Sequence, residues 1–185
     1  MAVMLPFSRI VRFYLGTVPD TEGRMIADIW QWSRPEIDAS PQAFNWLFPL
    51  RDSDRLRGAP RLFKEDIVNF QMHAKLQEHA RKSYAWFTGI IGLSLGEDGS
   101  ITKGPSFLQD FDVEMPLTIR RIRRVVQFLR IVGLDDEAGR FLGWLEAEAA
   151  SEGSRLPITL VAYWRMGIEP KTADSGVGGE DDGEM

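Results

Sequence analysis

Apolar side chains recur at helical spacing through most of this chain, and this repeat constrains its fold more than any other feature. No stretch alternates apolar and polar residues over five or more positions, which is the pattern of a half-buried strand. The sequence therefore predicts an all-α protein. A chain of 185 residues that is 44% hydrophobic can bury one substantial core. We expect a single compact domain of six to eight helices over residues 5–168.

Prolines, glycines and capping residues divide the predicted domain into helices. Ser40 caps a helix that begins at Pro41, and Gly133 ends another. The apolar spacing predicts helices over residues 6–14, 24–32, 41–48, 62–70, 72–93, 116–132, 135–150 and 158–166. The last of these could be helix or strand by its pattern, and we favour helix because no partner strand is evident. Residues 96–114 are predicted to form a loop.

The net charge of the chain is concentrated at its end. Of 27 acidic and 22 basic residues, six acids and one lysine follow residue 168, so the preceding body carries 21 charges of each sign. Residues 169–185 have almost nothing apolar to bury and cannot offset the entropy lost on ordering. We therefore expect a short disordered acidic tail.

The segment TIRRIRRVVQFLR, residues 118–130, predicts an amphipathic helix in which one charged residue falls on the apolar face. On a helical wheel most of its arginines, including Arg124, form a polar face. Arg121 instead falls in the apolar arc, between Phe128 and Val132. An arginine keeps its proton and is seldom buried unless acceptors receive its donors. The sequence therefore predicts a polar focus around Arg121 inside the domain.

Two roles for Arg121 stay open. The first is an internal salt bridge that ties its helix to another, because buried ions must be paired. Candidate partners are Asp20, Glu22 and Asp28. The second is an arginine held ready for the carboxylate or phosphate of a ligand. The sequence does not decide between these roles.

The chain carries none of the motifs that mark a metal, nucleotide or hydrolase site. It has no cysteine, and its two histidines, His73 and His79, lie on different faces of one predicted helix. His73 falls among apolar residues, which favours a core histidine over a ligand. We expect no metal, no cofactor and no catalytic residue, and the sequence leans away from an enzyme.

Composition also bears on partners and location. A charge-balanced body without aromatics interleaved among the basic residues argues against nucleic-acid binding. We find no transmembrane segment and no secretory signal. A cysteine-free chain fits a reducing compartment, so we expect an intracellular, cytoplasmic protein. The sequence does not indicate its oligomeric state.

Aromatic residues are crowded into the first fifty positions. Trp30 and Trp32 lie 200° apart on one predicted helix, so one core cannot easily bury both. Either helices pack on both sides of this one, or one of the two tryptophans lines a groove or an interface, which would also include Tyr14 and Trp46. Arg121 would lie near the polar end of such a groove.

Several blocks of the sequence resemble the conserved domain of the opioid growth factor receptor family. The blocks are RFYLGTVPDTEGRMIADIWQWS, FNWLFPLRD, KEDIVNF, WFTGIIGL and TIRRIRRVVQFLRIVGLDDEAGRFLGWL, and the resemblance as a whole covers about residues 10–168. The resemblance places Arg121 and Arg124 on arginines of the family pattern. Glu114, Met115 and Pro116 replace a His-Asn-Tyr block typical of the family.

The resemblance implies an all-helical domain with receptor-like signalling activity. For the animal namesake it implies binding of the enkephalin pentapeptide and association with intracellular membranes. Our first hypothesis is accordingly a module that binds a peptide or small molecule. An enzyme of an unrecognised helical class that acts on a small molecule is the alternative, with Arg121, His73 and an acid as its polar set. A third possibility is an interaction protein whose exposed tryptophan forms an oligomer surface.

Overall fold

The computed structural model describes residues 7–51 and 59–166, and these confirm the all-α class. They form ten helices and one two-stranded sheet. The number of helices exceeds the six to eight expected, because several of them are short. The elements, in chain order, are α1 (Arg9–Tyr14), α2 (Ile26–Ile29), α3 (Arg34–Ala39), α4 (Pro41–Leu47), α5 (Lys64–Met72), α6 (Ala74–Ile90), β1 (Leu93–Leu95), β2 (Ile101–Lys103), α7 (Phe107–Asp110), α8 (Pro116–Ile131), α9 (Asp135–Ala149) and α10 (Ile158–Met166). The predicted acidic tail lies outside the described residues.

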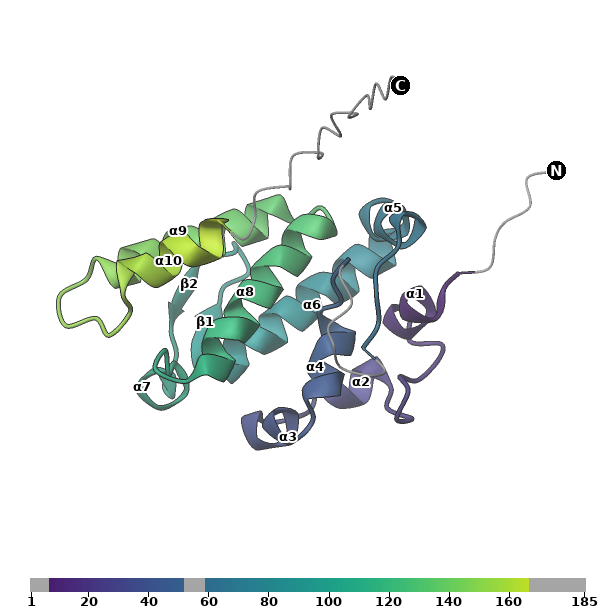
Figure 1. Ribbon diagram of the computed structural model, residues 1–185, viewed down its shortest axis with the longest axis horizontal. Helices are drawn as coiled ribbons and strands as arrows, with labels where there is room; N and C mark the ends of the chain where they lie inside the picture. The colour runs from purple at the N-terminus through teal and green to yellow at the C-terminus, as the bar shows by residue number, and fades with distance from the viewer. Residues whose placement is uncertain (1–6, 52–58, 167–185) are drawn as a thin grey trace, which may run out of the picture.

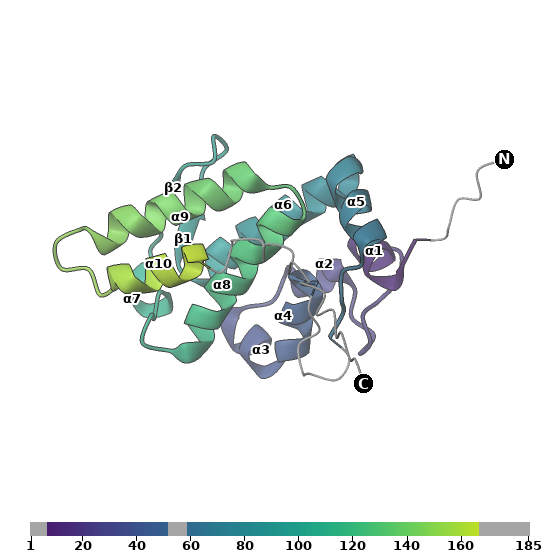
Figure 2. The same ribbon diagram turned by 45° about the horizontal axis from the view of Figure 1, so that its top comes forward.

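Helix α8 lies at the centre of the fold. It packs against α9 and α10 on one side, and α3 and α4 lie on its other side (Figures 1 and 2). Helices α5 and α6 pack on each other and on α1. The arrangement brings residues near positions 40 and 160 to opposite flanks of α8. Among the described residues, no helix combines the length and apolarity needed to cross a bilayer.

A chain of aromatic rings fills the core between these helices. Tyr14, Phe70, Phe128, Phe48 and Phe87 follow one another with ring centroids 4.8 to 6.0 Å apart. The pairs are mostly edge to face, the geometry that aromatic quadrupoles favour. All five side chains are fully buried. Much of the aromatic excess noted in the sequence is therefore core.

The β-hairpin corrects the prediction of a helix to residue 93 followed by a loop. Helix α6 ends at Ile90, and Gly92 follows with φ +78°, a backbone angle that other residues rarely adopt. A Cβ at Gly92 would lie 2.6 Å from the Cα of Phe107, so only glycine permits this close approach. β1 then pairs with β2 in an antiparallel ladder of three residues each. Strands this short leave no detectable alternation in the sequence.

Local capping produces a helix that the sequence analysis missed. Glu36 accepts a hydrogen bond from the backbone of Ser33 at 2.7 Å, which starts α3. This helix has only six residues, too few for apolar periodicity to reveal it. Of the helix predicted over residues 24–32, only Ile26–Ile29 is helical, as α2. A second correction concerns His73, which has extended backbone angles and separates α5 from α6.

The buried tyrosines make the fold sensitive to alkali. Burial raises the pKa of Tyr14 and of Tyr84 above the ordinary tyrosine value. The neutral form is therefore favoured in the folded state, so this stability is complete below about pH 10 and is lost as the pH rises further. We expect both residues to ionise only on unfolding, in one cooperative step of the absorbance near 295 nm. Gradual ionisation of both residues before the loss of helical circular dichroism would contradict this.

Candidate functional site

Arg121 forms an internal tie between α8 and α3. Its side chain is buried, with 6% of the residue exposed. One guanidinium nitrogen donates to the carboxylate of Asp38, and Nη2 donates to the carbonyl oxygen of Ile37 at 3.0 Å. The guanidinium also lies 4.9 Å from the ring centroid of Phe44. Burial lowers the pKa of Arg121, and Asp38 opposes this shift. The predicted burial of Arg121 is confirmed, and its acceptors are internal.

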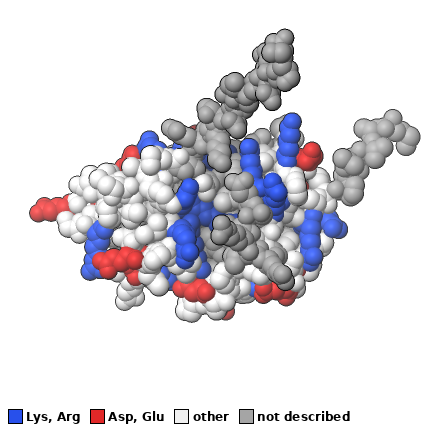
Figure 3. Space-filling model, viewed as in Figure 1, with Lys and Arg blue, Asp and Glu red and all other residues white. Residues whose placement is uncertain are grey.

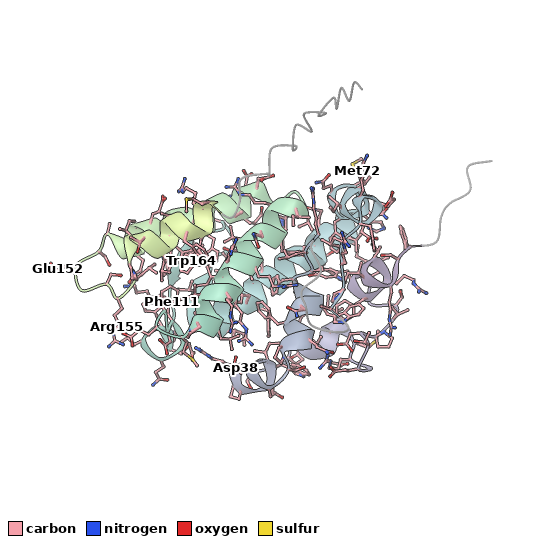
Figure 4. All side chains as sticks on the ribbon, viewed as in Figure 1. Asp38, Met72, Phe111, Glu152, Arg155 and Trp164 are labelled. Atoms are coloured by element: carbon pink, nitrogen blue, oxygen red, sulfur yellow. The ribbon has the colours of Figure 1, made fainter. Side chains whose placement is uncertain are left out.

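The partner of Arg121 differs from the three candidates named from the sequence. Asp38 projects from α3, the helix that the sequence pattern did not reveal (Figure 4). Asp20 is buried and instead binds Arg24 through both the backbone nitrogen at 3.0 Å and Nε at 2.6 Å. Asp28 accepts from the backbone nitrogen of Met25 at 3.1 Å. Glu22 also pairs with Arg24, at 2.7 Å. These three acids therefore stabilise local turns.

A groove of about 520 Å³ opens beside this tie, between α4, α8 and α10. We call it the arginine groove, because its lining includes four arginines of α8: Arg120, Arg121, Arg123 and Arg124. No acidic side chain is among its described lining residues. Figure 3 shows Lys and Arg side chains gathered at the centre of one face. Phe44, Leu50 and Leu117 supply apolar surface within it.

Two of the groove arginines donate to oxygen atoms of α4 and α10 or their ends. Arg124 donates through Nε to the carbonyl oxygen of Phe48 at 2.6 Å, so it is half-buried rather than part of a fully solvated face. Arg123 donates to the hydroxyl of Tyr163 and lies 4.7 Å from the centroid of that ring. The hydroxyl of Tyr163 does not neutralise the charge of Arg123. With no acid among its described lining residues, the groove has a positive electrostatic potential.

Buried donors in the groove lack acceptors among the described residues. Asn45 lines the groove, is 5% exposed, and its Nδ2 has no hydrogen-bond partner there. The Nε of Arg123 is likewise buried without one. Arg120 is exposed at the rim and makes no ion pair with the described residues. An unsatisfied buried donor costs about 1–3 kcal/mol, so such groups usually meet a ligand or water. These donors and the charge of Arg120 allow the groove to bind an anion.

The aromatic residues predicted to line a groove do not line this one. Tyr14 is fully buried and donates to the carbonyl oxygen of Leu47. Trp46 is buried against Phe13, with ring centroids 5.1 Å apart. The structure therefore places both in the core, away from any groove they were expected to form with Arg121.

The other two tryptophans of the predicted groove, Trp30 and Trp32, are half-buried and contact α6. Trp30 donates through Nε1 to the hydroxyl of Ser83 at 3.0 Å, and Lys82 lies 4.3 Å from its ring centroid. Trp32 lies 5.6 Å from the guanidinium of Arg24. Neither residue lines the arginine groove. Both tryptophans are already covered on one face by cationic side chains.

The polar set of the enzyme alternative is not assembled. His73 lies at the junction of α5 and α6, with its ring 6.2 Å from that of Phe7. It does not line the arginine groove, where Arg121 lies. The described residues contain no group of three or more histidine, cysteine or acidic side chains placed to hold a metal ion.

Two groove residues were missed by sequence reasoning although each carries a signal. Asn45 is the one polar residue within the aromatic run FNWLF, and a polar side chain inside a buried helix requires a partner. Tyr163 lies on a segment that is apolar on every side. Its exposed face could have been recognised as the wall of a site. The sequence alone does not show that α10 contacts α8, and this contact brings Tyr163 to the groove.

Similarity to known proteins gives no independent support for this site. No protein-family model, curated protein or solved structure matches the chain. The resemblance to the opioid growth factor receptor family therefore stays a prediction from the sequence blocks named above.

Proposed function

We propose that this protein is a binding module whose arginine groove takes an anionic peptide or small molecule. The observation that carries the proposal is a pair of buried donors, Asn45 Nδ2 and Arg123 Nε, that have no acceptor among the described residues, in a groove whose described lining includes no acid. A carboxylate or phosphate supplies the acceptor oxygens that these donors lack. Arg120 at the rim, which makes no ion pair with the described residues, adds a further charge.

The groove also suits an apolar part next to the anion. Phe44, Leu50 and Leu117 line it, and its volume of about 520 Å³ falls in the usual range for small-molecule sites. Tyr163 adds an aromatic face from α10. The best ligand therefore carries an acidic group on an aromatic or aliphatic body of roughly drug or short-peptide size.

In this proposal Arg121 positions the site and does not bind the ligand directly. Both of its terminal nitrogens donate to acceptors of α3, Asp38 and Ile37, which hold α3 against α8. Phe44 lies under its guanidinium and is thereby fixed at the groove wall. The ligand contacts come instead from the neighbouring arginines and Asn45.

The family resemblance is compatible with this role. A short peptide with an aromatic side chain and a free carboxylate, such as the enkephalin pentapeptide implied by the family, has the chemistry that the groove favours. We include receptor-like activity and peripheral membrane association in the proposal on that resemblance alone, and a cytoplasmic location on the absence of cysteine from the sequence.

The proposal is tested by calorimetric titration of phenyl phosphate into the full chain. Arg120→Gln with Arg123→Gln should weaken binding at least about tenfold, because each charge-assisted hydrogen bond contributes about 1.5–3 kcal/mol. Asn45→Asp keeps the side-chain shape, replaces the donor with a negative charge, and should abolish binding. The matched control is Arg12→Gln with Arg155→Gln, which removes the same charge at exposed positions elsewhere. Equal losses in the two double variants would contradict a specific groove.

A further inference from the structure

The arginine groove lies beside the point where the acidic end of the chain begins. Tyr163 lines the groove, and α10 ends one turn later at Met166. Residues 167–185 follow, and they contain six acidic residues against a single lysine. An acidic cluster of the sequence therefore follows directly on the helix that forms one wall of the arginine groove.

Charge complementarity favours these two regions as partners. The body of the protein is balanced at 21 charges of each sign, so no general excess of positive charge attracts the acidic segment elsewhere. Arg121 is already paired with Asp38, but Arg120 and Arg123 make no ion pair with the described residues, and no acid is among the described lining residues of the groove. Two other pockets of the described residues are lined by acids, which would repel the acidic segment. Glu148 and Glu152 line one, and Glu97, Asp98 and Glu137 line the other.

The acidic segment is long enough to enter the groove. Its densest acids, Glu180 to Glu184, follow Met166 by 14 to 18 residues. A flexible chain of 14 residues has a root-mean-square reach of about 20 Å and extends to about 45 Å. A tether of this length gives an effective concentration on the order of 1 mM. Even a weak carboxylate contact is then appreciably populated.

We propose that residues 169–185 dock in the arginine groove of their own chain and compete with external anions. This inference rests on the proposed function, because it uses the same donors. Carboxylates of the segment accept from Asn45 Nδ2 and Arg123 Nε and neutralise Arg120. The segment thereby lowers the affinity of the groove for a weak ligand and leaves it open to a stronger one. The protein regulates its own binding site in this way.

A proximity measurement tests the docking without any ligand. The chain has no cysteine, so Gly183→Cys provides one position for a nitroxide spin label. We expect the label to broaden the amide signals of Asn45, Arg120 and Tyr163, and the broadening to disappear near 1 M salt, where the Debye length is about 3 Å. The control carries the same label with Glu180→Gln, Asp181→Asn, Asp182→Asn and Glu184→Gln. Equal broadening in the control, or none in either protein, overturns the docking.

Two further measurements separate this inference from the proposed function. In a mixture of spin-labelled protein with isotope-labelled, cysteine-free protein, broadening of the latter would show docking between chains and overturn the own-chain arrangement. The four neutralising substitutions alone should tighten phenyl phosphate binding about fivefold, as expected for a competitor near 1 mM that binds with a Kd of about 0.25 mM. If phenyl phosphate binds and the four neutralising substitutions leave its affinity unchanged, the proposed competition is overturned, but the docking is not. Failure of phenyl phosphate to bind either protein overturns the proposed function, and the broadening then decides the docking separately.

Discussion

Arg121→Ala is expected to lower the free energy of unfolding by about 2–4 kcal/mol. The substitution removes the donor to the buried carbonyl oxygen of Ile37 and one of the two cations of Asp38, which keeps Arg34 at 3.6 Å. It also opens space beside Phe44, over which the guanidinium lies. The loss stays below the largest values for buried pairs because the Asp38 side chain is 33% exposed and can be partly solvated. Urea denaturation followed by circular dichroism measures the change.

A neighbouring arginine gives the matched control for this substitution. Arg120→Ala removes the same charge from an exposed position of the same helix and should change stability by at most about 0.5 kcal/mol. Arg121→Lys should recover only part of the loss, because an ammonium group cannot reproduce the two directed hydrogen bonds. If Arg121→Ala were as stable as the Arg120 variant and failed to bind phenyl phosphate, Arg121 would be a ligand residue instead of a structural tie.

Trp164→Ala is expected to lower the free energy of unfolding by about 3–5 kcal/mol and to abolish phenyl phosphate binding. Trp164 is fully buried between α10 and α8 and donates through Nε1 to the carbonyl oxygen of Ile119 at 3.1 Å (Figure 4). It anchors α10, and therefore Tyr163, whose ring lines the groove and packs on Arg123. Loss of the anchor removes one wall of the site. Thermal unfolding and calorimetric titration at a temperature where the variant is folded measure the two effects.

Other substitutions on α10 separate anchoring from general damage to the helix. Ile158 is 57% exposed, so Ile158→Ala should be nearly neutral for stability and for binding. Trp164→Phe keeps an aromatic ring but loses the hydrogen bond to Ile119, and should cost about 1–2 kcal/mol with binding retained. Full binding by folded Trp164→Ala would show that α10 is not needed for the site.

The long helices were predictable because each carries several turns of apolar periodicity between clear boundaries. Pro116 opens α8 and Gly133, at φ +82°, follows its end, as the sequence indicated. The missed elements are short and are stabilised by local contacts. Helix α3 depends on the Ser33 and Glu36 cap, and the hairpin depends on the close backbone approach at Gly92. Periodicity alone is a weak signal over three to six residues, and α1, which also has six, was predicted because Pro6 and Gly16 mark its ends in the sequence.

The candidate site was predictable only in part, for a related reason. The helical wheel identified Arg121 as buried, because this follows from positions within one helix. Its partner Asp38 could not be identified, because it comes from the missed helix α3. The aromatic groove was expected from composition, but packing places Tyr14 and Trp46 in the core. Asn45 and Tyr163 meet the arginines only through contacts of α4 and α10 with α8. Such contacts between distant segments are not visible in a single sequence.

The most direct measurement of the anion site is a nuclear magnetic resonance titration of the full chain with phenyl phosphate. The side-chain amide of Asn45 and the Nε–H of Arg123 should shift together and saturate, because both are buried donors in the groove. The Nε–H of Arg121 should move little, since its guanidinium is already bound to Asp38 and Ile37. Shifts confined to exposed arginines outside the groove, with Asn45 and Arg123 unchanged at saturation, would contradict the account.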